Sequence, residues 1–214
     1  MSICSLGYFN PVTQNNPSYY PSQLQSGFDL THYFITGASA GIGAALATKL
    51  NKDKHQVSAV ARRADRLAAL QQASDYFCGY QADVRDADAI AAAINDSVKT
   101  CGPIDVAILN AGIYTPQDGC QIIPNIYAEH MDVNYMGVVN GLAAIIPRML
   151  AAGGGQIVIM SSVAGWRGLP KAAAYAPTKA ALIALAESLY FDLTPKNIKI
   201  QVMCPGFVDT EATA

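Results

Sequence analysis

The stretch Thr36-Gly37-Ala38-Ser39-Ala40-Gly41-Ile42-Gly43 decides the fold of this chain. It follows a short apolar run and leads at once into a helical pattern. Glycines are needed where a chain turns tightly and where its backbone must approach a pyrophosphate closely. The helix that follows offers unpaired N–H groups and its positive dipole end to an anion. Three glycines can also be ordinary turn chemistry, but their position at the first strand–helix junction favours a dinucleotide-binding loop.

Outward from this loop, short apolar runs alternate with longer helical patterns. Strands are predicted at His32–Thr36, Gln56–Ala61, Tyr76–Ala82, Ile104–Asn110, Gln156–Ser161 and Lys199–Cys204. Helices are predicted near Ile42–Lys52, Asp65–Ala73, Asp86–Thr100, Tyr127–Ala152 and Ala173–Leu193. Several of the strand runs are apolar throughout, which is typical of strands buried on both faces. The pattern predicts an α/β fold, a doubly wound, Rossmann-like parallel sheet with helices on both faces.

Composition sets the broad class. The chain has 214 residues, of which 51% are hydrophobic and 14% charged, with a net charge of −2. These values indicate a globular protein with no basic surface for nucleic acid. Residues 1–28 are rich in Asn, Gln, Pro, Ser and Tyr, so they are predicted to form an irregular N-terminal arm. An arm that wraps a partner subunit is the alternative. The dinucleotide-binding domain is predicted to span residues 29–214.

Cysteine usage and the N-terminal sequence bear on location. The five cysteines form no CxxC pair and leave one over, so we expect thiols in a reducing compartment and no metal site. No Lys or Arg precedes Lys49, which fits neither a secretory signal nor a mitochondrial presequence. The apolar runs are broken by Gly, Pro or charge, so no membrane span is expected. The expected location is cytoplasmic.

The end of the second predicted strand bears on the choice of nucleotide. It reads Val60-Ala61-Arg62-Arg63, and the first acid is Asp65. An acid at this point would match a ribose 2′-hydroxyl, whereas a 2′-phosphate requires positive charge. Arginine pairs with phosphate in bidentate fashion. The sequence therefore favours NADP(H), although two solvated arginines at a helix start would look the same.

Tyr175 and Lys179 are four residues apart in a helical segment, so both point to one helix face. An ammonium beside a phenol stabilises the phenolate and would bring its pKa toward neutrality. Upstream, a buried strand ends in Ser161-Ser162, where a hydroxyl can donate to a substrate carbonyl. None of the three histidines is expected at the carboxyl end of the sheet, so acyl transfer by a serine nucleophile is disfavoured.

Together these motifs resemble the short-chain dehydrogenase/reductase superfamily over roughly residues 31–210. The resemblance rests on the glycine loop, Asp83, Asn110-Ala111-Gly112, Asn134, Ser162 with Tyr175 and Lys179, and Pro205-Gly206.

The resemblance implies catalytic roles. Tyr175 would be the general acid/base, Ser162 would polarise the substrate oxygen, and Lys179 would lower the Tyr175 pKa and hold the nicotinamide ribose. Asn134 would position a water that links Lys179 to solvent. Ser162 is preferred over Ser161 by its spacing to Tyr175.

It also implies a cofactor site. Asp83 would lie by the adenine, Asn110 by the ribose, and Arg62 would follow the family's acidic NAD position, here Ala61. The residues assigned to the cofactor are Gly37, Ser39, Gly41, Ile42, Gly43, Arg62, Arg63, Asp83, Asn110, Ala111, Gly112, Tyr175, Lys179, Pro205, Gly206 and Thr210.

Two long helices favour self-association. Ala176–Ala186 and Val138–Leu150 are apolar on nearly every face, and such a helix must be covered on more than its sheet side. Family members pair these helices across a dimer interface, so the resemblance implies a homodimer or homotetramer. The alternative is that the same positions only build the core of one subunit.

The sequence stops soon after Pro205-Gly206, where relatives continue with a substrate-covering helix pair and a last strand. We therefore expect a C-terminally truncated domain that binds cofactor weakly and turns over slowly. The strand at Lys199–Cys204 is expected to present an open apolar edge. Two alternatives to an enzyme are an NADPH-binding regulatory protein and an inactive partner in a hetero-oligomer.

Substrate class rests on a few apolar positions. Side chains expected to face the pocket favour a small apolar ketone or secondary alcohol over a charged sugar. They could equally be packing residues. They are Ile113, Tyr114, Trp166, Leu169 and Phe207.

Overall fold

A computed structural model describes residues 30–72 and 74–209. Its centre is one six-stranded sheet in the order β3-β2-β1-β4-β5-β6, in which every neighbouring pair is parallel. The order reverses direction between β1 and β4, which is the point where doubly wound sheets bind ligands. The strands are β1 (His32–Thr36), β2 (Gln56–Ala61), β3 (Phe77–Gln81), β4 (Val106–Leu109), β5 (Gly155–Met160) and β6 (Ile198–Met203).

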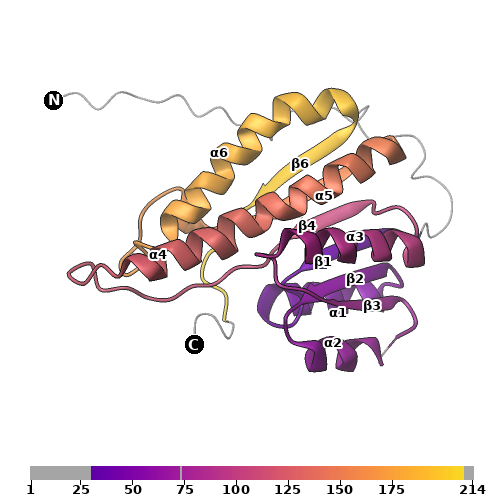
Figure 1. Cartoon of the computed structure of the whole chain (residues 1–214), viewed down its shortest axis with the longest axis horizontal. Helices are drawn as coiled ribbons and strands as arrows, with labels where there is room; N and C mark the ends of the chain where they lie inside the picture. Colours follow the sequence, from indigo (N-terminus) through magenta and orange to yellow (C-terminus); the bar gives the residue numbers. More distant parts are fainter. Residues whose placement is uncertain (1–29, 73, 210–214) are drawn as a thin grey trace.

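Helices cover both faces of the sheet (Figure 1). Side chains of α3, α5 and α6 join one buried cluster with the strands, and side chains of α1 and α2 join a second cluster. This arrangement confirms the predicted doubly wound α/β fold. The helices are α1 (Gly41–Lys52), α2 (Ala64–Gln71), α3 (Ala87–Cys101), α4 (Pro124–Met131), α5 (Gly137–Ala152) and α6 (Ala176–Leu193).

The helix predicted at Tyr127–Ala152 starts earlier and contains a π-helical turn. It begins at Pro124, because proline suits the first helical turn. Between α4 and α5 lies a π-helical turn, η2 (Asp132–Met136), which contains Asn134. Such bulges have no simple sequence signature and often mark functional positions.

This continuous helix corrects one expectation. Pro124–Ala152 is 29 residues long and reaches a mean hydropathy of 1.4 in its apolar window, so the apolar runs are not all well short of a membrane span. One third of that window is buried within the protein. Val138, Leu142, Ile145 and Met149 follow helical spacing and pack into the core beside the sheet. These apolar side chains are therefore part of the protein core. The length and hydropathy of the helix are by themselves weak evidence for a membrane-spanning segment.

Strand β6 lies at the edge of the described sheet, as expected, with β5 as its one neighbour among the described residues. Ile198, Ile200 and Val202 join the cluster that includes α6, whereas Lys199 and Gln201 alternate with them and are exposed. Met203 lies on the same side as Lys199 and Gln201 and is 44% exposed, so the uncovered side of this edge strand carries both polar and apolar side chains. The N-terminal arm lies outside the described residues.

Candidate active site

A cavity of about 900 Å³ lies at the carboxyl edge of the sheet, over the junction of β1 and β4. Most of the residues that the sequence assigned to a site line it. Gly43 and Asn134 are not among the lining residues but contact them, and Thr210 lies outside the described residues. The assigned residues that line the cavity are Gly37, Ser39, Gly41, Ile42, Arg62, Arg63, Asp83, Asn110, Ala111, Gly112, Ser162, Tyr175, Lys179, Pro205 and Gly206.

The glycine loop connects β1 to α1 in a geometry that larger residues cannot adopt. Gly37 and Gly41 have φ angles of +70° and +53°, in the left-handed region. A Cβ on Gly43 would lie 2.4 Å from the carbonyl oxygen of Gly37, so the helix packs directly on the loop. No acidic side chain stands in the first turn of α1, and no side chain caps it. The first-turn N–H groups of α1 therefore have no side-chain acceptor, and Gly41 and Ile42 in this turn line the cavity, where a pyrophosphate could accept from them.

Basic side chains gather beside this loop at the end of β2. Arg62 is exposed and lines the cavity. Arg63 Nε donates to Ser39 Oγ over 3.1 Å, and Arg66 Nη1 donates to the Ser39 carbonyl over 3.2 Å. Arg66 was missed by the sequence analysis, since only its position in the first turn of α2 brings it to the loop. Arg62, Arg63 and Arg66 thus lie together beside the glycine loop, and Ala61 supplies no acid at the end of β2.

Asp83 follows β3 and lines the cavity, but its carboxylate is already paired. Arg85 Nη2 lies 2.6 Å from Asp83 Oδ2, and Arg85 Nε contacts both carboxylate oxygens at 3.1 Å. Hydrogen bonds from Arg85 lower the pKa of Asp83 and keep it ionised. Arg85 is a second residue that sequence reasoning missed.

The segment Asn110-Ala111-Gly112 joins the ends of β4 and β1. Asn110 Nδ2 donates to the Thr36 carbonyl over 3.0 Å, and the Asn110 and Ala111 N–H groups donate to Thr36 Oγ1 over 3.0 and 3.1 Å. A Cβ on Gly112 would lie 3.2 Å from Asn134 Oδ1 and 3.4 Å from Lys179 Nζ. Glycine there allows both side chains to lie close behind the cavity wall.

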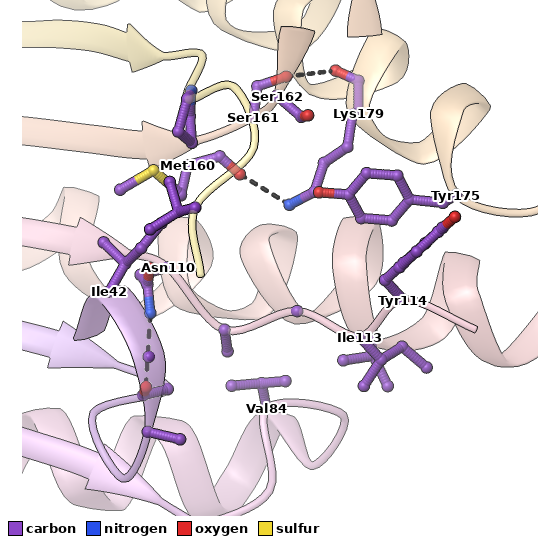
Figure 2. Close-up of a pocket in the computed structure, with 18 of the residues that line it drawn as sticks. Ile42, Val84, Asn110, Ile113, Tyr114, Met160, Ser161, Ser162, Tyr175 and Lys179 are labelled. Carbon is purple, nitrogen blue, oxygen red and sulfur yellow. Dashed lines mark hydrogen bonds between the residues drawn. The ribbon is translucent and has the colours of Figure 1, made fainter. Parts of the chain in front are cut away.

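Ser162 follows the end of β5, Tyr175 and Lys179 lie at the start of α6, and the three converge at one end of the cavity (Figure 2). Tyr175 directly precedes α6, and Pro177 stands in its first turn, so Lys179 follows one turn later on the same side. The Lys179 ammonium lies 5.5 Å from the centre of the Tyr175 ring and donates to the Met160 carbonyl over 2.8 Å. Helical spacing and the end of a neighbouring strand thus bring the three polar groups together.

Ser161 and Ser162 have different roles in the structure. Ser161 Oγ donates to the main-chain carbonyl of Lys179 over 2.9 Å and so fixes α6 to the end of β5. Ser162 Oγ accepts from the Ala164 N–H over 3.2 Å and faces the cavity beside Tyr175. The second hydroxyl is therefore the one placed to meet a substrate.

Asn134 is fully buried beside this group. Its Oδ1 accepts from the Ile113 N–H over 2.7 Å, and its Nδ2 donates to the Ile113 carbonyl over 3.0 Å and to Thr178 Oγ1 over 3.2 Å. All its side-chain polar groups are thus engaged within the protein. Asn134 ties the loop after β4 to α6 and holds the cavity wall in place.

The pKa of Tyr175 is shifted in the direction opposite to that expected from the sequence. Burial lowers the pKa of Lys179 to about 8, whereas burial raises the pKa of Tyr175, and the neighbouring Ser162 hydroxyl acts in the opposite direction. The expected lowering of the Tyr175 pKa by Lys179 is not seen in this structure. The ammonium is directed to Met160, and the loss of water around the phenol outweighs the other influences.

The histidines give no base for a serine nucleophile. His32 begins β1 and His55 precedes β2, so both lie at the amino end of the sheet. His130 lies nearer to the cavity than expected, since its Nε2 accepts from the N–H of Thr115, which lines the cavity, over 3.1 Å. Its Nδ1 contacts the Ile126 carbonyl over 2.7 Å and the residue is fully buried, so both ring nitrogens are engaged with the main chain.

The substrate end of the cavity is largely apolar. Ile113, Tyr114, Leu169 and Phe207 line it, and the Tyr114 ring meets the Tyr175 ring edge-on at 5.2 Å. Trp166 does not line the cavity and is 72% exposed, so the expectation that it faces the pocket was wrong. The short 3₁₀ turn Val163–Gly165 ends at Trp166, and this residue lies on the outer surface.

These features define a dinucleotide-binding fold in which Ser162, Tyr175 and Lys179 stand at the end of the cavity away from the glycine loop. The family model for short chain dehydrogenase matches residues 31–214. The chain therefore belongs to the short-chain dehydrogenase family and is an oxidoreductase that acts on CH–OH or C=O groups.

Individual relatives agree with this assignment. The chain is 34% identical over 184 residues to oxidoreductase UcpA of Escherichia coli K12, covering 82% of this chain and 68% of that protein. Its structure is similar to a short-chain dehydrogenase/reductase from Burkholderia phymatum in complex with NAD, with 29% identity and a TM-score of 0.81, covering 86% of this chain and 68% of the other. It is also similar to ElxO with NADP bound, with 28% identity and a TM-score of 0.80, covering 86% and 76%.

Proposed function

We propose that this protein is an NADP(H)-dependent oxidoreductase that interconverts small apolar ketones and secondary alcohols, with Tyr175 as the general acid/base. The observation that carries the proposal is the convergence of Ser162, Tyr175 and Lys179 at one end of a cavity whose other end is a glycine loop. The nicotinamide cofactor, when bound, supplies or accepts the hydride.

The preference for NADP(H) rests on charge. Arg62 lines the cavity, Arg63 and Arg66 contact Ser39, and Ala61 occupies the position where an acid would favour a free 2′-hydroxyl. A 2′-phosphate there would meet guanidinium groups suited to bidentate pairing. The structures similar to this chain include one with NAD and one with NADP bound. The proposal of NADP(H) therefore rests on the arginines of this chain and not on those structures.

The polar residues act on the substrate oxygen. Ser162 would donate a hydrogen bond to the carbonyl, and the Tyr175 hydroxyl would give its proton to the oxygen as negative charge develops there. Because burial raises the pKa of Tyr175, the phenol carries its proton near neutral pH, the form that a proton donor to the substrate oxygen requires. Lys179 would replace that proton from its ammonium. A water relay from Lys179 to solvent would use the main-chain carbonyl of Asn134, since its side chain is engaged.

The proposed assembly is a homodimer or homotetramer through α5 and α6. Exposed apolar side chains remain on these helices and beside them, including Met136, Leu150, Tyr190 and Phe191, which is 73% exposed. Apolar surface of this kind is typical of contacts between subunits.

The test is a titration of the purified protein with NADPH and NADH, followed by assays with a panel of ketones. We expect NADPH-selective binding and reduction of apolar ketones. The Tyr175→Phe variant should bind NADPH within about threefold of wild type while kcat falls by roughly 10²–10⁴-fold. Loss of binding in the variant, or unchanged turnover, would contradict the assigned role.

A second candidate is an NADPH-binding regulatory protein. It would bind the nucleotide with the same selectivity and reduce no carbonyl compound in the panel. The full set of Ser162, Tyr175 and Lys179 favours the enzyme, because nucleotide binding alone does not require a serine and a tyrosine hydroxyl facing the substrate end.

A further inference from the structure

Two cysteines far apart in the sequence meet on the side of the protein away from the cavity. Cys78 is the second residue of β3, and Cys101 is the last residue of α3. Their sulfur atoms are 3.5 Å apart, which is van der Waals contact, so no other atom separates them. We propose that Cys78 and Cys101 form a reversible disulfide, a modification site that closes the β3–α3 unit into a covalent loop.

Neighbouring side chains hold both sulfurs in this position. Gln56 Nε2 donates to Cys78 Sγ over 3.7 Å, and Ser58 Oγ donates to Cys101 Sγ over 3.8 Å. Both donors lie on β2, and Cys78 pairs with Ser58 in the sheet register. The two thiols are therefore anchored to the same strand, which fixes β3 and the end of α3 relative to each other.

The anchoring extends into a buried polar cluster. Ser58 Oγ also lies 2.8 Å from His32 Nε2 and accepts a hydrogen bond from Ser97 Oγ over 2.8 Å. His32, Ser58 and Ser97 are almost completely buried, so they cannot move apart without losing hydrogen bonds away from water. The cluster restrains the position of Cys101 through Ser58 and through Ser97, which lies one helical turn before it.

The two sulfur atoms need to move only a short distance to form the bond. A disulfide has a sulfur–sulfur bond of about 2.05 Å, so the two atoms must approach by roughly 1.5 Å. Both side chains are partly exposed, so a small thiol or disulfide reagent can reach them. The loop so closed contains Asp83 and Val84, which line the cavity.

The reaction needs a disulfide oxidant such as oxidised glutathione. One cysteine thiolate attacks the oxidant, forms a mixed disulfide and releases one glutathione thiol. The second cysteine loses its proton and attacks the protein sulfur of that bond, which forms the Cys78–Cys101 bond and releases a second glutathione thiol. Two protein thiols are oxidised, and one oxidised glutathione is reduced to two thiols.

The surroundings of Cys78 also affect the rate at which the disulfide forms. Burial and the contact with Cys101 raise the pKa of Cys78 to about 11, so little of its thiolate is present near neutral pH. Because the thiolate is the attacking species, formation should be slow at pH 7 and faster as pH rises.

The test places the folded protein in glutathione redox buffers, quenches it with acid, alkylates free thiols and maps the tryptic peptides without reduction. Cys78 falls in peptide 67–85, but peptide 100–148 holds both Cys101 and Cys120. The Cys120→Ser chain is therefore used, since Cys120 is exposed and belongs to neither the cavity nor the pair. The same chain in urea measures the pairing that occurs without the fold.

We expect the 67–85 and 100–148 peptides to be linked in the folded protein, with an equilibrium constant at least about tenfold above that in urea, since the fold holds the thiols together. Adding Cys78→Ser should leave Cys101 free or bound to glutathione. Recovery of Cys78 and Cys101 mainly as free thiols or separate glutathione adducts in the folded chain would overturn the proposal, as would an equilibrium constant no larger than in urea.

Discussion

The ammonium group of Lys179 donates a hydrogen bond over 2.8 Å to the main-chain carbonyl of Met160, the last residue of β5. The side chain is 3% exposed, and no carboxylate among the described residues forms an ion pair with it. Helix α6 thus holds a cation at the end of the sheet with few groups to replace its water. Burial accordingly lowers its pKa from 10.5 to about 8.

The first prediction concerns stability against pH. The unfolded chain binds more protons at Lys179 than the folded chain between about pH 8 and 10.5, so the free energy of unfolding should rise with pH in that range. The rise attributable to this residue is about 3 kcal/mol. Urea unfolding of wild type and Lys179→Met should show a difference that grows in favour of wild type above pH 8. A constant difference would contradict the assignment, and Lys99→Met, at an exposed lysine, should follow wild type.

The second prediction concerns the glycine loop. A Cβ on Gly43 would lie 2.4 Å from the Gly37 oxygen and 2.6 Å from Asn110 Nδ2, so Gly43→Ala must displace the loop from α1. We expect a loss of about 1–3 kcal/mol in unfolding free energy and weaker binding of either nucleotide. Gly119→Ala is the matched control, because no atom lies within 4 Å of its added Cβ. Equal behaviour of the two variants would show that the loop tolerates the displacement.

The third prediction concerns cofactor choice. Arg62→Ala removes positive charge from the cavity beside the glycine loop, so the Kd for NADPH should rise roughly tenfold while that for NADH changes less than about twofold. Isothermal titration calorimetry with both nucleotides measures the two values. Arg148→Ala removes an exposed arginine that donates to Asn95 on α3, outside the cavity, and should change neither Kd. An equal loss for both nucleotides would refute the role of Arg62 in selectivity.

The fourth prediction concerns Asn134. Asn134→Ala removes three hydrogen bonds of a fully buried side chain and leaves the partly buried N–H of Ile113 without its acceptor, so the free energy of unfolding should fall by about 2–3 kcal/mol. Chemical denaturation measures this loss. The control is Asn95→Ala on the exposed face of α3, which should stay within about 0.5 kcal/mol of wild type. A loss no larger than that of the control would mean that the loop after β4 relaxes to find another acceptor.

Much of the fold was predictable because its signals are local. Alternating strand and helix patterns, apolar runs in the central strands and glycines at the first turn each follow from the chemistry of a few adjacent residues. The predicted bounds of β1 and β2 agree with the structure, and the other strands agree to within two residues. The π-helical turn around Asn134 was not predictable, since such a turn has no simple sequence signature.

The sequence by itself determined the class of fold, the residue types available for proton transfer and the absence of an acid after β2. Only the tertiary structure decided which groups meet. It placed Arg66 on Ser39 and Arg85 on Asp83, turned Trp166 outward, and brought Cys78 into contact with Cys101 across 23 positions. It also decided that burial, and not Lys179, dominates the pKa of Tyr175. Desolvation and side-chain contact depend on everything that surrounds a group in space, and most of those neighbours are distant in the chain.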